Sequence, residues 1–169
     1  MGSTLTVDNI VGATTAANVK LPAGTVLQTV NATHATATTS TSSSFVATLL
    51  NATITPKYNT SKILVRFSLP AYAASGIHVV GTIFRETGIA SSNAAISGTN
   101  LGDSGWGFSS TFNNGAEGMG GVHCTGVLDS PATTSALRYT VAYRQHNNGT
   151  ATVFPNGSMG TITLQEVSQ

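Results

Sequence analysis

Charged side chains are scarce in this chain. Asp, Glu, Lys and Arg make up 8% of its 169 residues, and the formal net charge is +1, whereas typical soluble domains carry about 25% charged residues. The seven Lys and Arg residues form no cluster, so they offer no electrostatic footprint for nucleic acid, which requires several phosphates to be neutralised together. We therefore expect no nucleic-acid partner. So neutral a surface also gives little repulsion between copies, which suits a protein that packs against itself.

Cysteine and long apolar runs are also lacking. The single cysteine, Cys124, excludes an internal disulfide and is typical of a protein made in a reducing cytosol. No apolar run reaches the roughly 18 to 20 residues needed to cross a bilayer. No basic segment followed by an apolar one marks a secretory signal at the N-terminus. We expect neither membrane insertion nor secretion by the usual route.

Paired catalytic groups are missing as well. No two of the six carboxylates are neighbours in sequence: Asp8, Glu86, Asp103, Glu117, Asp129 and Glu166. Asp103 and Glu117 share one long loop. They could therefore be the paired carboxylates of a glycosidase, and the alternative is that both are solvated loop residues. The chain has no Gly-x-Ser-x-Gly nucleophile elbow and no phosphate-binding Gly-Lys-Ser/Thr loop. We expect no enzymatic activity and no cofactor.

The four histidines, His34, His78, His123 and His146, do not form a His-x-His pair, which would place two imidazoles on one face of a strand. His123 and Cys124 are adjacent and should point to opposite faces of their strand, so they are not expected to share a metal ion. No metal site is expected within one chain. The alternative is a metal site between chains, formed where three copies of one histidine meet on a threefold axis.

What the chain does have is alternation with a period of two residues. Ile63, Val65, Phe67 and Leu69 recur at every second position, so they share one face of a strand. We expect residues 45–54, ended by Pro56, and 62–69 to be two strands of a β-meander joined by a polar turn. Similar patterns predict strands at 77–84, 122–128, 137–143, 151–154 and 160–167. The segment 77–84 is apolar on both faces, so it should be covered on both.

Many short strands with no helical stripe predict an all-β fold, an antiparallel β-sandwich or jelly-roll-like single domain at residues 25–169. Residues 1–24 are small and polar and read as an extended N-terminal arm. Its alternating start could add as an edge strand to a neighbouring chain, and a frayed terminus is the alternative. The residues expected to dock the arm are Leu5, Val7, Ile10 and Val11.

Three aromatic residues at even positions, Trp106, Phe108 and Phe112, lie in the Gly, Ser and Asn-rich segment 88–121. An exposed aromatic ring on a loop can stack on a sugar or anchor a protein partner. Alternatively these rings close the end of the sandwich or form a contact between copies.

Glu166 follows Ile162 and Leu164 in the two-residue register, which predicts a buried carboxylate. An unpaired buried charge is costly. We therefore expect a structural ion pair between Glu166 and one of the basic residues Arg66, Arg85, Arg138 or Arg144.

Several segments together resemble a recurring β domain of structural proteins in tailed bacteriophages, especially marine and cyanobacterial phages. They are residues 43–50, 54–56 and 61–65, the closing segment 160–167, and the opening segments 4–8 and 19–24. The resemblance covers most of the chain and marks a fold and a virion setting, not a chemistry.

The resemblance implies a non-enzymatic virion protein, assembled in the host cytoplasm as a homotrimer and forming a fibre or tail appendage. Its expected partners are copies of itself and other virion proteins, such as major capsid or tail proteins, with a host surface glycan as a further candidate. Two alternatives are a capsid decoration or cement protein and a carbohydrate-binding module.

Overall fold

The computed structural model describes residues 21–88, 96–113 and 118–169, and these form eleven strands and one short 3-10 turn. The strands are β1 (Val26–His34), β2 (Thr38–Ser40), β3 (Val46–Ile54), β4 (Lys62–Ala73), β5 (His78–Thr87), β6 (Thr99–Asn100), β7 (Ser109–Phe112), β8 (Gly118–Asp129), β9 (Leu137–His146), β10 (Ala151–Val153) and β11 (Gly160–Val167), and the turn is η2 (Pro155–Gly157).

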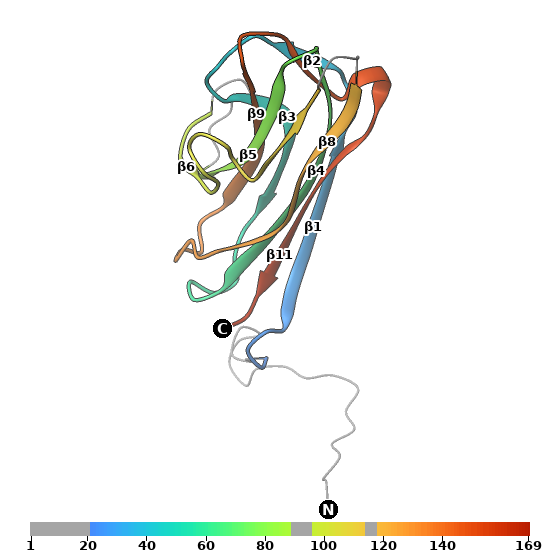
Figure 1. Cartoon of the computed structure of the whole chain (residues 1–169). Coiled ribbons are helices and arrows are strands. Elements are labelled where there is room, and N and C mark those ends of the chain that lie inside the picture. Colours follow the sequence, from blue (N-terminus) through green and yellow to red (C-terminus); the bar gives the residue numbers. More distant parts are fainter. Residues whose placement is uncertain (1–20, 89–95, 114–117) are drawn as a thin grey trace, which may run out of the picture.

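The strands form two antiparallel sheets that pack face to face (Figure 1). Sheet A runs in the order β1, β11, β4, β8, and the short β10 and β2 continue it beside one end of β4. Sheet B runs β3, β9, β5, with β6 and β7 both paired to β5. When β2, β6 and β10 are set aside, the eight main strands are connected in the order of a jelly roll. The expected all-β sandwich is confirmed.

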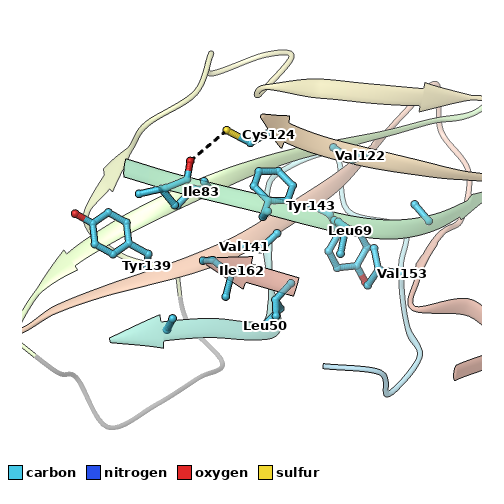
Figure 2. Packing of buried hydrophobic residues seen from close by; sticks show 14 of the residues in the cluster. Leu50, Leu69, Ile83, Val122, Cys124, Tyr139, Val141, Tyr143, Val153 and Ile162 are labelled. Atoms are coloured by element: carbon cyan, nitrogen blue, oxygen red, sulfur yellow. Dashed lines mark hydrogen bonds between the residues drawn. The ribbon is translucent and has the colours of Figure 1, made fainter. Parts of the chain in front are cut away.

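The core lies between the two sheets and follows the alternation of the sequence. Ile63, Val65, Phe67 and Leu69 of β4 are all buried, as their spacing predicts. Facing them are Tyr139, Val141 and Tyr143 of β9 and Leu50 of β3 in sheet B, while Ile162 of β11 lies beside Phe67 in sheet A. Figure 2 shows several of these side chains packed together. Full burial of one such side chain contributes about 1.5 to 3 kcal/mol, so the core accounts for the fold without a disulfide or a metal.

The predicted meander at residues 45–69 is wrong. β3 pairs with β9 in sheet B, whereas β4 pairs with β8, β10 and β11 in sheet A. The connection at 55–61 therefore crosses from one sheet to the other instead of turning back beside the first strand. Alternation specifies which face of a strand is buried but not which strand lies beside it. The sequence pattern was therefore equally compatible with a hairpin and with a crossing.

The outer faces of the two sheets differ. The outward face of β5 is buried, with Val80 and Thr82 at 0% exposure, because residues 98–108 run along and over it. The Thr82 hydroxyl donates to Asn100 Oδ1 at 2.5 Å, and the Phe108 amide donates to the Gly81 carbonyl at 2.9 Å. The expectation that this strand is covered on both sides is confirmed. The outward residues of sheet A remain exposed or partly exposed.

The N-terminal arm predicted at residues 1–24 falls mostly outside the described residues, as do its expected docking residues Leu5, Val7, Ile10 and Val11. Its described end is attached to the domain: the Gly24 amide donates to the Ser168 carbonyl at 2.9 Å, and the Ser168 hydroxyl donates to the Pro22 carbonyl at 2.6 Å. The arm therefore leaves the domain beside the C-terminal end of β11 (Figure 1). No helix in the described parts of the chain has the length and hydropathy to cross a membrane.

Candidate functional site: an aromatic and histidine cluster

Three neighbouring strands of sheet B bring one row of rings together on its outer face. In the register of the sheet, His78 at the start of β5 lies directly opposite Phe112 on β7 and directly opposite His146 on β9. Directly opposed residues of antiparallel strands point to the same face with Cβ atoms about 4.5 to 5.5 Å apart. Ile77 and Val79, which flank His78, are buried in the core, so the row points away from it.

Trp106 completes what we call the aromatic–histidine cluster, defined as His78, Trp106, Phe112 and His146. The rings of His78 and Phe112 are stacked with centroids 4.3 Å apart, and the Trp106 ring lies 5.2 Å from His78 and 4.7 Å from His146. The two imidazole centroids are 5.8 Å apart. Trp106 is 47% exposed and Phe112 48%, so the cluster presents two large rings to solvent while being supported from beneath.

The turn that carries Trp106 is fixed by its own backbone. Asp103 and Gly107 exchange two backbone hydrogen bonds of 2.9 and 3.1 Å, and Asp103 Oδ1 accepts from the amides of Gly105 at 2.8 Å and Trp106 at 2.6 Å. These amide donors lower the pKa of the Asp103 carboxyl, because they stabilise its ionised form. The Arg144 guanidinium on β9 donates to the Gly105 carbonyl, with Nε at 3.0 Å. Trp106 is therefore held in place before any partner arrives, which reduces the entropy cost of binding.

Glycine is required at one position of this turn. Gly107 has a φ of +59°, and a Cβ atom there would fall against the carbonyl oxygen of Gly81 on β5. An L side chain would thus meet both an unfavourable backbone conformation and a backbone clash. Gly107 lets the turn lie flat on sheet B.

The electrostatics of the cluster are dominated by His78. Its Nδ1 atom is buried without a hydrogen-bond partner. Burial, and after it the positive charge of His146, lower the pKa of His78, because both disfavour the imidazolium form. The cluster is thus a largely aromatic surface in which a charge on His78 is disfavoured, and it is suited to the apolar face of a sugar ring or to an apolar side chain of a protein partner.

The predicted aromatic set is divided by the structure. Trp106 and Phe112 lie in the cluster, whereas Phe108 turns inward, packs against the core and meets the Phe67 ring at 6.3 Å. Nothing in the sequence distinguishes His78 and His146 from the other two histidines, His34 and His123. The two-residue alternation of side chains could have placed each histidine on the outward face of its strand, since His78 lies between the inward residues Ile77 and Val79. Only the pairing of β5 with β9 makes the two histidines neighbours.

Glu166 is fully buried, as its register predicts, but the expected arginine or lysine partner is wrong. Its carboxylate accepts from the Gln28 side-chain amide at 2.6 Å and from the backbone amides of Lys57 at 2.7 Å and Tyr58 at 3.4 Å. The two ion pairs among the described residues join Arg85 to Asp129 and Arg138 to Glu86, while Arg144 binds the Trp106 turn and Arg66 is exposed. Backbone amides from the connection between the sheets supply the compensation that a cation was expected to give.

The remaining candidates do not assemble into a second site. Asp103 serves the turn, and Glu117 lies outside the described residues. His123 is exposed and Cys124 buried, on opposite faces of β8 as expected. In the described residues no three or more His, Cys, Asp or Glu side chains lie together so that they could hold a metal ion.

A pocket of about 190 Å³ lies at the other end of the molecule. Its lining residues are Leu21, Tyr58, Asn59, Thr60, Ser168 and Gln169. It lies beside the described end of the N-terminal arm, and its lining contains no pair of ionisable side chains. The pocket is therefore better suited to packing against a polypeptide segment than to catalysis.

Comparisons with known proteins leave the chain without an assigned family. A scan against models of protein families gives no match, and a search of curated proteins gives none either.

Proposed function

We propose that this chain is a non-enzymatic structural protein of a tailed-bacteriophage virion, which assembles with copies of itself as a homotrimer into a fibre or tail appendage. The virion setting and the trimer rest on the resemblance of residues 43–50, 54–56, 61–65 and 160–167, with the opening segments 4–8 and 19–24, to phage structural domains. Self-assembly has separate support from the surface of the fold.

The observation that carries the proposal is the outer face of sheet A. The register of β1, β11, β4 and β8 aligns three cross-strand rows there: Thr29, Gln165, Leu64 and Leu128; Asn31, Thr163 and Arg66; and Thr33, Thr161, Ser68 and His123. All these residues are exposed or partly exposed, and none is a carboxylate. Such a face brings little charge repulsion when two copies meet.

The same face is ordered by its own hydrogen bonds. The Asn31 side-chain amide donates to the Thr163 hydroxyl at 2.8 Å, and the Gln165 amide donates to the Thr29 hydroxyl at 3.4 Å. Leu128, 49% exposed, adds apolar area at one end. A flat surface whose side chains are already held loses less conformational entropy on packing, which favours contact between copies.

Light scattering of the full chain after size exclusion tests self-assembly. The proposal expects a mass three times that of the 17.2 kDa chain. Thr163→Lys adds a second cation beside Arg66 and should give monomers with an unchanged circular dichroism spectrum, while Thr53→Lys, an exposed residue of β3, should remain trimeric. A wild-type chain that stays monomeric at high concentration would refute self-assembly.

A capsid decoration or cement protein is the first alternative, and it uses the same carboxylate-free face against capsid subunits. The two roles differ in copy number, since cement is present on the scale of the capsid and a fibre in a few tens of copies or fewer. Densitometry of a gel of purified particles separates them.

The exposed rings of Trp106 and Phe112 favour a second alternative, a carbohydrate-binding module or receptor contact within the virion protein. Aromatic rings of this kind bind the apolar face of sugars. Retention on a glycan array that is lost in Trp106→Ala supports it, and loss of host adsorption with assembly intact would locate the contact in the particle. An array without signal counts against glycan binding.

A further inference from the structure

The aromatic–histidine cluster holds two imidazoles, each of which can take up a proton, and the other rings of the cluster pack around one of them. His78 is surrounded by the rings of Phe112, Trp106 and His146, and its Nδ1 is buried without a partner. A neutral imidazole can leave an acceptor nitrogen there. An imidazolium must place an N–H donor at the same position, and a buried donor without an acceptor is destabilising.

Other charges near the cluster do not offset a proton on His78. On β9, Arg144 and His146 face the same side, and Arg144 is already positive and bound to the Gly105 carbonyl. The turn contributes Asp103, whose Oδ1 is occupied by two backbone amides. β7, Ser109–Phe112, contributes no titratable side chain, and on β5 the residues that share the outward face of His78 near the cluster are Val80 and Thr82.

Two opposing effects decide how many protons the cluster accepts. An imidazolium at His78 is attracted by the face of the stacked Phe112 ring, so one proton is tolerated. Two imidazolium rings with centroids 5.8 Å apart repel each other, and the second proton must also be placed next to the unpartnered Nδ1. The doubly protonated cluster is therefore the strained state.

We propose that the aromatic contact surface is acid-sensitive: it is intact while at most one of His78 and His146 is protonated, and Trp106 moves away from its support when both are. This inference rests on the proposed role of the cluster as a contact surface, and it adds that the contact is released on acidification, once both imidazoles are charged.

Trp106 is the only tryptophan of the chain, so its fluorescence reports the cluster without a label or a ligand. We expect the emission maximum of the full chain to shift to longer wavelength between pH 8 and pH 5, with stronger quenching by acrylamide. The change should reverse on return to pH 8. Far-ultraviolet circular dichroism should stay constant, because the sandwich remains folded. The wavelength and the acrylamide constant are the readouts, since a nearby imidazolium also lowers emission intensity directly.

The variants identify the groups. His146→Gln removes one of the two charges and should abolish the transition, as should His78→Gln; His123→Gln, an exposed histidine of sheet A, should leave it unchanged. A flat wild-type titration, or a transition that survives in both His78→Gln and His146→Gln, would overturn the inference. If His78→Gln does not fold, His146→Gln at the end of β9 decides alone. No partner is present in these measurements, so failure of the proposed virion role would leave their outcome unaffected.

Discussion

Two tyrosines on the same strand should respond in opposite ways to the same substitution. Tyr139 and Tyr143 of β9 are both fully buried in the core (Figure 2). The Tyr139 hydroxyl donates to Asp129 Oδ2 on the facing sheet at 2.7 Å, and Arg85 holds the other carboxylate oxygen at 2.6 Å. The Tyr143 hydroxyl is buried without a hydrogen-bond partner. Replacing each by Phe removes one oxygen atom from nearly the same environment.

The structure gives the size of each effect. Tyr139→Phe deletes a bond to a charged acceptor and should lower the free energy of unfolding by about 1.5 to 3 kcal/mol. Tyr143→Phe deletes no bond and removes a buried polar group whose desolvation costs about 1 to 3 kcal/mol. After allowance for the small void, we expect a gain of about 0 to 1 kcal/mol. The two variants should thus differ by about 1.5 to 4 kcal/mol.

Urea unfolding followed by circular dichroism measures both variants against the wild type. At roughly 2 to 4 °C per kcal/mol for a chain of this length, the melting temperature of Tyr139→Phe should fall by about 3 to 12 °C, and that of Tyr143→Phe should not fall. Equal losses in the two variants would refute the assignment of the Asp129 bond as the distinguishing interaction. A loss confined to Tyr143→Phe would show that its hydroxyl has a partner.

Three further perturbations have defined outcomes. Glu166→Ala leaves the partly buried Lys57 amide without its acceptor and should cost about 1 to 3 kcal/mol in urea unfolding, against less than about 0.5 kcal/mol for the outward neighbour Gln165→Ala; equal values would contradict the role of the carboxylate. Gly107→Ala should expose the Trp106 turn to proteolysis at neutral pH while the sandwich persists, because of its φ of +59°, and wild-type resistance would contradict the clash with Gly81. Burial raises the pKa of Tyr143 to about 12. The stability that its neutral form contributes is therefore complete below about pH 10 and is lost between about pH 10 and 12. In alkaline unfolding, Tyr143→Phe should lose less stability than the wild type over that interval.

Much of the fold could be predicted from local pattern. The alternation at Ile63, Val65, Phe67 and Leu69 fixed one buried face, and the even spacing of Ile162, Leu164 and Glu166 placed a carboxylate inside the core, as the structure confirms. These predictions succeed because side chains of a strand point alternately to its two faces whatever lies beside it. The same rule could not exclude a meander at residues 45–69, since a strand in either sheet buries one face equally well.

The candidate site was predictable only in part. Trp106 and Phe112 were predicted as a contact because they are aromatic rings in a polar segment. Phe108 also occupies an even position, but its side chain points inward, because the positive φ of Gly107 interrupts the two-residue alternation. His78 and His146 are 68 positions apart, and their meeting depends on the pairing of β5 with β9. Glu166 was predicted to pair with an arginine or lysine side chain. Instead its carboxylate accepts hydrogen bonds from the backbone amides of Lys57 and Tyr58, which lie in the connection that crosses between the sheets.

The sequence by itself determined that this protein is a strand-built, nearly uncharged domain with one face of each strand inside, because period and composition act on each segment separately. The tertiary structure alone decided which strands are neighbours, that β3 and β4 belong to opposite sheets, and that four rings from distant positions form one surface. Those outcomes depend on contacts between residues far apart in the chain, and the local pattern carries no information about their partners.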